Sequence, residues 1–435
     1  MKRTPKIAVI EFPGTNCEQE SATAIKRNGA IPYFFRWNDR ASMLEQCDGI
    51  VIPGGFSYED RSRSGIIAAM DPLMDTLKRE AEKGKPILGI CNGAQILIES
   101  GLVPGFKEYP LGAALAPNVQ KIDDHIIGTG FYNAWVYVTN GNESMTDAPF
   151  TASFSGQTVM RIPAAHAEGR FTIPPQLLTL YRENKMIPFR YCDQQGNVAT
   201  GFPENPNGSV DSIAALTNID QHVMAIMPHP ERTVAGDPIF LSMIRYIEKG
   251  ITVKIPSIDR PAIQQNVEQT VLPAGLRKEL TVASIVTDNT AVSVERELRR
   301  RNIPIHVKRM VHWTLVANEQ SNETAFETAY ERACSSGILF NPNKEYPIEP
   351  IIEPGGHAFV VKANLTEDSK GERALRVLHE IFKIDAFSMV EHAILWILQP
   401  DCTHTANSEV LIEQAVSTHI FNNPFSQRRI EYVWT

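Results

Sequence analysis

Cys91 stands where a short apolar run meets a helical pattern. Residues 86–90 (PILGI) predict a buried strand, and residues 94–100 have the apolar spacing of a helix that ends near Gly101. A cysteine on such a sharp strand-to-helix turn exposes its thiol at the helix N-terminus, where amide groups and the helix dipole favour the thiolate. We interpret Cys91 as a nucleophile; a buried structural cysteine is the alternative that this stretch alone leaves open.

A base for this nucleophile comes from the segment PHPE, which follows the apolar run 223–227. His229 and Glu231 are two residues apart, so on an extended backbone they project to the same side. Glu231 could then orient His229 while His229 faces the thiol of Cys91. Hydrolysis of a side-chain amide needs such a base beside a thiolate, together with donors for the oxyanion.

The oxyanion donors are predicted from two small-residue turns. Gly54 and Gly55 follow the apolar run 47–52, and the backbone amides of Gly55 and Asn92 are the expected donors, because glycine permits close approach and an elbow places the next N–H inward. Gln95 lies one helical turn beyond the nucleophile, so its side chain could reach a substrate; an exposed helix residue is the alternative. Cys17, in a turn before a helix, is interpreted as structural or substrate-adjacent.

Alternating strands and helices place these residues in an α/β domain. Apolar strands at 6–12, 31–37, 47–52 and 86–90, with a helix predicted over 64–83, indicate a doubly wound, mostly parallel sheet that binds ligands at the strands' carboxyl ends. This domain is expected to cover residues 1–252, and a linker to cover 253–278.

The remaining residues look like a duplication. The order β-α-β-α-β is predicted over 279–355 and again over 356–435. Asn341-Pro342 and Ile348-Glu349 recur as Asn423-Pro424 and Ile430-Glu431 at the same spacing. We therefore expect two tandem α+β units that pack as an internal pseudo-dimer.

Composition bounds the function. The 435 residues carry a net charge of −8 without a long basic run, which argues against a nucleic-acid partner. No apolar run is long enough for a membrane span, and the N-terminus has no signal-peptide core. The six cysteines lack CxxC spacing, so we expect no metal site, no disulfide framework and a cytoplasmic location. No GxxxxGK[ST] loop is present, so ATP and Mg²⁺ are not expected to bind here.

The residues from 6 to about 250 resemble the class I, triad-type glutamine amidotransferases, in which Cys91, His229 and Glu231 match the catalytic triad. Within that class they look like the glutaminase components of phosphoribosylformylglycinamidine synthases. The family more often has glycine where this chain has Glu59 and Ala167. The segments that carry the narrower resemblance are FPGTNCE (12–18), PGGFSY (53–58), HAEGRF (166–171), ENPNGSVDSIA (204–214) and MPHPER (227–232).

This resemblance implies a substrate and a partner. Glutamine would be hydrolysed to glutamate and ammonia, and a separate synthetase subunit, carrying ATP and Mg²⁺, would use the ammonia to amidate formylglycinamide ribonucleotide in purine biosynthesis. The loop with His166, Glu168 and Arg170 would lie at the glutaminase face, or else form an ion-paired surface loop. A glutaminase of another pathway and a non-catalytic scaffold for the synthetase are the alternatives.

The duplicated region resembles the small accessory subunit of the same synthase. Its segments GERALRVLHEIF (371–382) and NNPFSQRRIEYVW (422–434) carry this resemblance. It implies a bridge between glutaminase and synthetase, whose fusion to the glutaminase raises their effective concentration for one another. An unrelated ferredoxin-like regulatory domain is the alternative.

Overall fold

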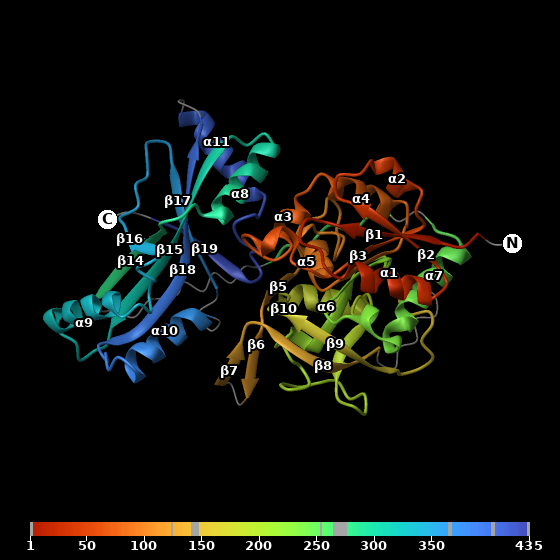
Figure 1. Ribbon diagram of the computed structural model, residues 1–435, viewed down its shortest axis with the longest axis horizontal. Helices are drawn as coiled ribbons and strands as arrows, with labels where there is room; N and C mark the ends of the chain where they lie inside the picture. The colour runs from red at the N-terminus through yellow and green to blue at the C-terminus, as the bar shows by residue number, and fades with distance from the viewer. Residues whose placement is uncertain are drawn as a thin grey trace. The chain divides into compact units, whose positions relative to one another are not determined.

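The computed structural model describes residues 3–122, 125–140, 148–252, 255–263, 276–363, 368–401 and 405–432 (Figure 1). Contacts divide the chain into two compact units, Met1–Ile263 and Gln264–Thr435. None of the helices in the described ranges is long and apolar enough to cross a membrane. Cys402 and the parts of the predicted linker at 253–254 and 264–275 lie outside the described residues.

A nine-stranded sheet forms the centre of the first unit, in the order β2-β1-β3-β4-β13-β12-β11-β8-β9. The first five strands of this order are parallel and the other four antiparallel. The central strands β3 and β4 are buried along their whole length, as expected for apolar strands covered on both faces. The strands are β1 (Lys6–Glu11), β2 (Ile31–Arg36), β3 (Gly49–Ile52), β4 (Ile87–Ile90), β8 (Tyr132–Thr139), β9 (Val159–His166), β11 (Phe189–Cys192), β12 (Ile213–Thr217) and β13 (Val223–Ile226).

Helices cover both faces of the parallel strands, which confirms the predicted fold class. Figure 1 shows α2 and α4 on one side of these strands and α1 and α7 on the other. The α5 helix packs against β3, β4 and β13. The helices of this unit are α1 (Glu18–Arg27), α2 (Ala41–Glu45), α3 (Ile66–Ala69), α4 (Leu73–Glu82), α5 (Asn92–Glu99), α6 (Pro175–Glu183) and α7 (Asp237–Lys249).

The single helix predicted over 64–83 is wrong. The chain forms α3 and α4 instead, separated by Asp71 and Pro72. Proline has no N–H to continue the hydrogen bonds of α3, and it is well tolerated where a helix begins. The carboxylate of Asp71 accepts a hydrogen bond from the N–H of Leu73 at 2.9 Å, which satisfies one of the free donors at the start of α4.

Two small antiparallel sheets complete the first unit. One pairs β5 (Ala114–Pro117) with β10 (Glu168–Thr172), and the other pairs β6 (Val119–Ile122) with β7 (His125–Thr129). Residues 255–263, predicted as part of a linker, are bonded to this unit. Lys107 donates its N–H to the carbonyl of Ile258 at 2.9 Å, and Arg260 donates to the carbonyl of Leu111 at 2.8 Å.

The second unit is one six-stranded antiparallel sheet in the order β16-β14-β15-β18-β17-β19. Residues 279–355 contribute the first half of this order and residues 356–435 the second, and the long strands β15 and β18 join the halves. The expected pseudo-dimer is therefore present within a single sheet. The elements are β14 (Arg277–Ser284), α8 (Asn289–Arg300), β15 (Ile305–Ala317), α9 (Glu323–Ser335), β16 (Glu345–Pro347), β17 (His357–Ala363), α10 (Ser369–Glu380), β18 (Phe387–Pro400), α11 (Thr405–Ser417) and β19 (Gln427–Glu431).

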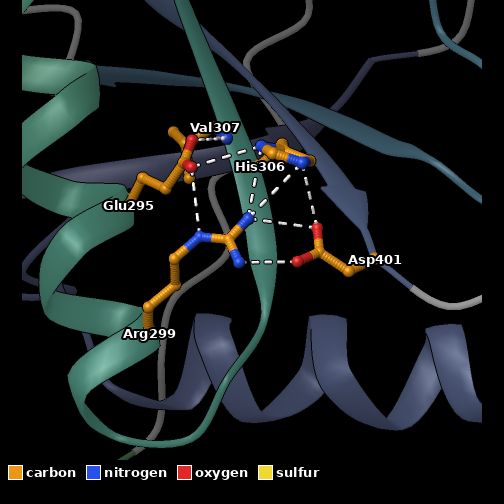
Figure 2. Close-up of polar contacts among 5 residues, drawn as sticks. All are labelled: Glu295, Arg299, His306, Val307 and Asp401. Atoms are coloured by element: carbon orange, nitrogen blue, oxygen red, sulfur yellow. Dashed lines mark hydrogen bonds and ion pairs between the residues drawn. The ribbon is translucent and has the colours of Figure 1, made fainter.

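A polar network ties the two halves of this sheet together (Figure 2). Arg299 on α8 forms ion pairs with Glu295 at 3.1 Å and with Asp401, which follows β18, at 2.6 Å. His306 on β15 lies 3.2 Å from each of the same two carboxylates. Because these side chains are 26–62% exposed, each pair contributes at most about 1 kcal/mol, so the network fixes geometry more than it adds stability.

Candidate active site

Cys91 lies on a strained turn between β4 and α5. Its backbone has φ 51° and ψ −105°, a conformation that residues other than glycine rarely adopt. The α5 helix begins at the next residue. Its N–H donates to the carbonyl of Ile226 on β13 at 2.8 Å, which fixes the turn to the sheet. Cys91 is 7% exposed, and its thiol lies 3.7 Å from the carbonyl of Ala165. This is the geometry of a nucleophile elbow.

His229 and Glu231 form a buried pair beside this thiol. The Nδ1 of His229 lies 2.7 Å from Oε1 of Glu231, and the two side chains are 2% and 0% exposed. Burial opposes protonation of the imidazole, but the negative charges of Glu231 and Cys91 outweigh it and raise the pKa of His229 to about 10. His229 is therefore a cation at neutral pH, which suits it to stabilise a thiolate and later to donate a proton.

The local backbone of this pair differs from the prediction. His229 has an intermediate conformation, with φ −101° and ψ 86°, and Glu231 lies in the short 3-10 helix η3 (Pro230–Arg232) instead of on an extended segment. The N–H of His229 donates to the carbonyl of Pro163 on β9 at 2.7 Å, which holds the turn in place. The expected contact therefore forms, but a tight turn makes it.

Gly54 lies at the meeting point of the reactive side chains. A Cβ atom there would lie 2.9 Å from Cε1 of His229, 3.1 Å from Sγ of Cys17 and 3.4 Å from Cβ of Cys91. Gly55 has φ 153°, and a Cβ atom on it would collide with the backbone of residues 14–16. Both glycines are thus required for close approach of the chain, as the sequence predicts.

Gly54→Ala is expected to lower kcat/KM for glutamine by roughly 10²-fold, because displacing His229 or Cys91 by a few tenths of an ångström spoils their alignment. The φ of Gly54 is not positive, so the added methyl group acts only through these contacts. Gly201→Ala is the matched control, since its Cβ would meet nothing within 4 Å. Steady-state kinetics of the two variants make the comparison, and equal activity would show that the site tolerates the methyl group.

A cavity of about 240 Å³ opens beside the thiol. It is smaller than the roughly 300–1,000 Å³ typical of sites for drug-sized ligands, so it suits a compact substrate. The predicted residues Cys91, His229, Gly55 and Gln95 line it. Further lining residues that sequence reasoning missed are Asn16, Phe56, Asp60, Ser64, Phe131, Ala165 and Arg232.

Asn92 and Gln95 lock the start of α5 to its surroundings. The amide of Asn92 accepts from the N–H of Ser57 at 3.0 Å and donates to Asp60 at 3.1 Å and to Gln95 at 2.9 Å. Gln95 in turn donates to the carbonyl of Glu168 at 2.6 Å and is 5% exposed, so it is not the exposed helix residue of the alternative. Both side chains hold the elbow and the loops around it.

The loop after β3 has an unusual backbone. Tyr58, Glu59 and Asp60 all have φ between 51° and 58°, within the 3-10 helix η1 (Ser57–Asp60). Glycine adopts a left-handed backbone such as that of Glu59 with less strain than other residues do, which agrees with the glycine that the resemblance implies at this position. Burial, reinforced by the charge of Glu168, raises the pKa of Asp60 to about 7.

The loop of His166, Glu168 and Arg170 is divided between two environments. His166 and Glu168 line the cavity, whereas Arg170 donates to the carbonyl of Pro117 at 3.0 Å and is 9% exposed. Burial, with the nearby charge of His229, lowers the pKa of His166 to about 3, so this imidazole is neutral. Its Nδ1 lies 3.2 Å from Oδ1 of Asn118. His166 and Glu168 are therefore part of the cavity wall, and Arg170 is buried beside Pro117.

Residues 4–238 match the family described as the CobB/CobQ-like glutamine amidotransferase domain, which is more than half of the chain. The chain belongs to this family. Among curated relatives of this amidotransferase, the phosphoribosylformylglycinamidine synthase subunit PurQ of Methanothrix thermoacetophila is 42% identical, over 56% of this chain and 98% of that protein. PurQ of Pyrococcus furiosus is 41% identical, with the same two shares.

A solved structure is also similar to this amidotransferase. The structure of PurLQS from Thermotoga maritima contains a chain that is 32% identical, with a TM-score of 0.44, over 56% of this chain and 100% of that one. The family match ends at residue 238, before the second unit begins at residue 264.

Proposed function

We propose that this chain is the glutaminase component of a phosphoribosylformylglycinamidine synthase. The observation that carries the proposal is the buried His229–Glu231 pair beside the thiol of Cys91. This chain is also 42% identical to a PurQ subunit, over 98% of that subunit and 56% of this chain. Its activity would be hydrolysis of glutamine to glutamate and ammonia. The ammonia would serve the ATP-dependent amidation of formylglycinamide ribonucleotide by a separate synthetase subunit in purine biosynthesis.

The chemistry follows from the positions of the side chains. The thiolate of Cys91 attacks the side-chain carbonyl carbon of glutamine, and the oxyanion accepts hydrogen bonds from the backbone amides of Gly55 and Asn92. His229 gives its proton to the leaving nitrogen, which departs as ammonia and leaves a thioester on Cys91. His229 then removes a proton from water, which attacks the thioester and releases glutamate. Glu231 keeps the imidazole in the productive orientation throughout.

The same proposal assigns the other components. ATP and Mg²⁺ belong to the synthetase partner, and this chain itself needs no cofactor for thioester chemistry. The two tandem β-α-β-α-β units, one continuous sheet here, are proposed to act as the small accessory subunit that joins glutaminase to synthetase. A reducing compartment such as the cytoplasm suits a mechanism that depends on the free thiol of Cys91.

A glutamine analogue that carries an electrophilic diazoketone tests the glutaminase assignment. We expect covalent labelling of Cys91, found by peptide mass spectrometry, and protection of this residue by excess glutamine. Cys17 lines the same cavity and serves as the internal control, because burial raises the pKa of its thiol to about 11 and so disfavours the thiolate. A chain that is folded but unlabelled at Cys91 would support the non-catalytic scaffold.

Reconstitution tests the pathway. The chain is mixed with the synthetase subunit, ATP, Mg²⁺, glutamine and formylglycinamide ribonucleotide, and formation of the amidine is measured. Glutamine-dependent synthesis is expected only when both proteins are present. Labelling of Cys91 without any synthesis, combined with activity alongside a synthetase of another pathway, would instead favour a different class I amidotransferase.

A further inference from the structure

Three side chains that could each bind a metal ion, from the two ends of the first unit's sequence, lie together at the catalytic cavity. Ligand atoms of Cys17, His229 and Glu231 lie within 4.8 Å of one another. All three residues are buried, at 2%, 2% and 1% exposure. The scattered cysteines led us to expect no metal site, and spacing could not reveal this cluster, because Cys17 precedes α1 whereas the other two residues follow β13.

Part of this cluster has no role in the proposed reaction. Among the residues that the structure describes, Oε2 of Glu231 is buried and has no hydrogen-bond partner, and the same holds for Nε2 of His229. Nε2 is explained by its proton transfers, but neither Oε2 of Glu231 nor Sγ of Cys17 takes part in them. A buried acceptor without a partner has lost its hydration without replacement, so a ligand that engages it is stabilised.

We propose that Cys17, His229 and Glu231 form an inhibitory binding site for a thiophilic divalent cation, with Zn²⁺ as the representative ion. A thiolate, an imidazole and a carboxylate are the donor types that zinc prefers, and three protein donors leave a fourth position for water. With Zn–S near 2.3 Å and Zn–N near 2.0 Å, neighbouring donors lie roughly 3.3–3.8 Å apart. The ligand atoms lie within 4.8 Å of one another, and Nδ1 of His229 is 2.7 Å from Oε1 of Glu231, so the site forms by small shifts of the three side chains.

A cation can reach this site from the cavity, and on binding it displaces the proton of His229 and that of Cys17, whose pKa burial raises to about 11. Cys17 lines the 240 Å³ cavity, so an ion that enters the cavity reaches its sulfur. The guanidinium of Arg232 now donates to this sulfur at 3.1 Å, and its side chain is 33% exposed, so it can turn to solvent when a cation arrives. Other charged residues of the neighbouring helices do not line the cavity: these are Lys26 and Arg27 in the last turn of α1 and Asp237 in the first turn of α7.

Occupation of the site would stop the glutaminase. A cation bound to a ring nitrogen of His229 removes the group that gives and takes the proton, and binding to Glu231 competes with the 2.7 Å hydrogen bond that orients the ring. This inhibition rests on the proposed glutaminase function, whereas the binding does not. A chelator restores activity because no covalent bond to carbon is formed.

Co²⁺ and Cd²⁺ report binding directly through the absorption of metal–thiolate charge transfer. The full chain is titrated without glutamine, and we expect one equivalent to bind tightly. Cys17→Ser is expected to weaken binding at least about tenfold, and His229→Asn by a similar factor. Cys47→Ser is the matched control: Cys47 is equally buried but its thiol lies near the carbonyl of Met43, away from the cavity. Cys17→Ala repeats the test if the serine variant unfolds, as judged by thermal melting.

Two results would overturn the inference. One is binding by Cys17→Ser and Cys17→Ala that equals the wild type; the other is a charge-transfer band that vanishes only in Cys91→Ser. Zn²⁺ inhibition of glutamine hydrolysis, reversed by a chelator and weakened at least about tenfold by Cys17→Ser relative to its own uninhibited rate, would support it. An active glutaminase that binds no Co²⁺ would refute this site alone, whereas a chain that binds Co²⁺ without glutaminase activity would refute only the proposed function.

Discussion

Replacing Cys91 by serine is expected to lower kcat/KM for glutamine by on the order of 10⁴-fold or more, as the loss of a nucleophile does in enzymes of this kind. The substitution keeps the shape of the side chain on the strained turn at φ 51°. A serine hydroxyl remains protonated beside the cationic imidazole of His229, so the oxygen cannot replace the thiolate. The measurement is glutamate release, with and without the synthetase subunit.

Ammonia separates a chemical effect of Cys91→Ser from a structural one. When ammonium salt replaces glutamine, the complex with the synthetase subunit should keep its wild-type rate of amidine synthesis, because only the supply of nitrogen has changed. Cys192→Ser is the control for loss of a buried thiol, since Cys192 is 1% exposed and lies on β11. Glutamine use that survives in Cys91→Ser would exclude Cys91 as the nucleophile.

The elbow was predictable because its signals are local. An apolar strand, a small-residue turn and a helical pattern all lie within residues 86–101, and each fixes its own conformation. The duplicated sheet was predictable for a related reason: element order and matched tails define each half. Each half then offers one long strand at its edge, and these two strands, β15 and β18, pair antiparallel, with Ile305 opposite Pro400.

The rest of the site depends on contacts that no local pattern encodes. Asp60 and Phe131 line the cavity through loops whose positions are set by tertiary structure. The split of the predicted helix at Pro72 was readable from the proline itself, since the ring cannot continue a helix. The tight turn of His229 was not, because its backbone is fixed by a bond to Pro163 on a distant strand.

Glu231→Gln tests whether the carboxylate orients and charges the imidazole. We expect kcat/KM for glutamine to fall by about 10³-fold, because an amide can present its NH₂ group to Nδ1 of His229 and favour the wrong tautomer. Loss of the negative charge also removes one cause of the raised pKa, so burial should pull the pKa of His229 down from about 10. As the pH rises, His229 of the variant should therefore lose its proton, and the variant its activity, at a lower pH than in the wild type.

The pair also links pH to stability. In the wild type, the folded pKa of about 10 lies above the ordinary histidine pKa of 6.5, so the protonated imidazole stabilises the fold fully below pH 6.5. That contribution is lost as pH rises towards 10, and it should be smaller in Glu231→Gln. Thermal melting of both proteins between pH 6 and about 10 measures the difference.

An equally buried carboxylate elsewhere in the unit provides the control for Glu231→Gln. Glu80 on α4 is 1% exposed and pairs with Lys83 and Lys85, so Glu80→Gln also removes a buried charge but leaves the cavity untouched. We expect Glu80→Gln to lower the melting temperature and to keep kcat/KM, whereas Glu231→Gln lowers kcat/KM in a protein that remains folded. If Glu231→Gln kept a rate within about threefold of the wild type, His229 would have to be oriented by its backbone bond to Pro163 alone, and Glu231 would be a structural residue.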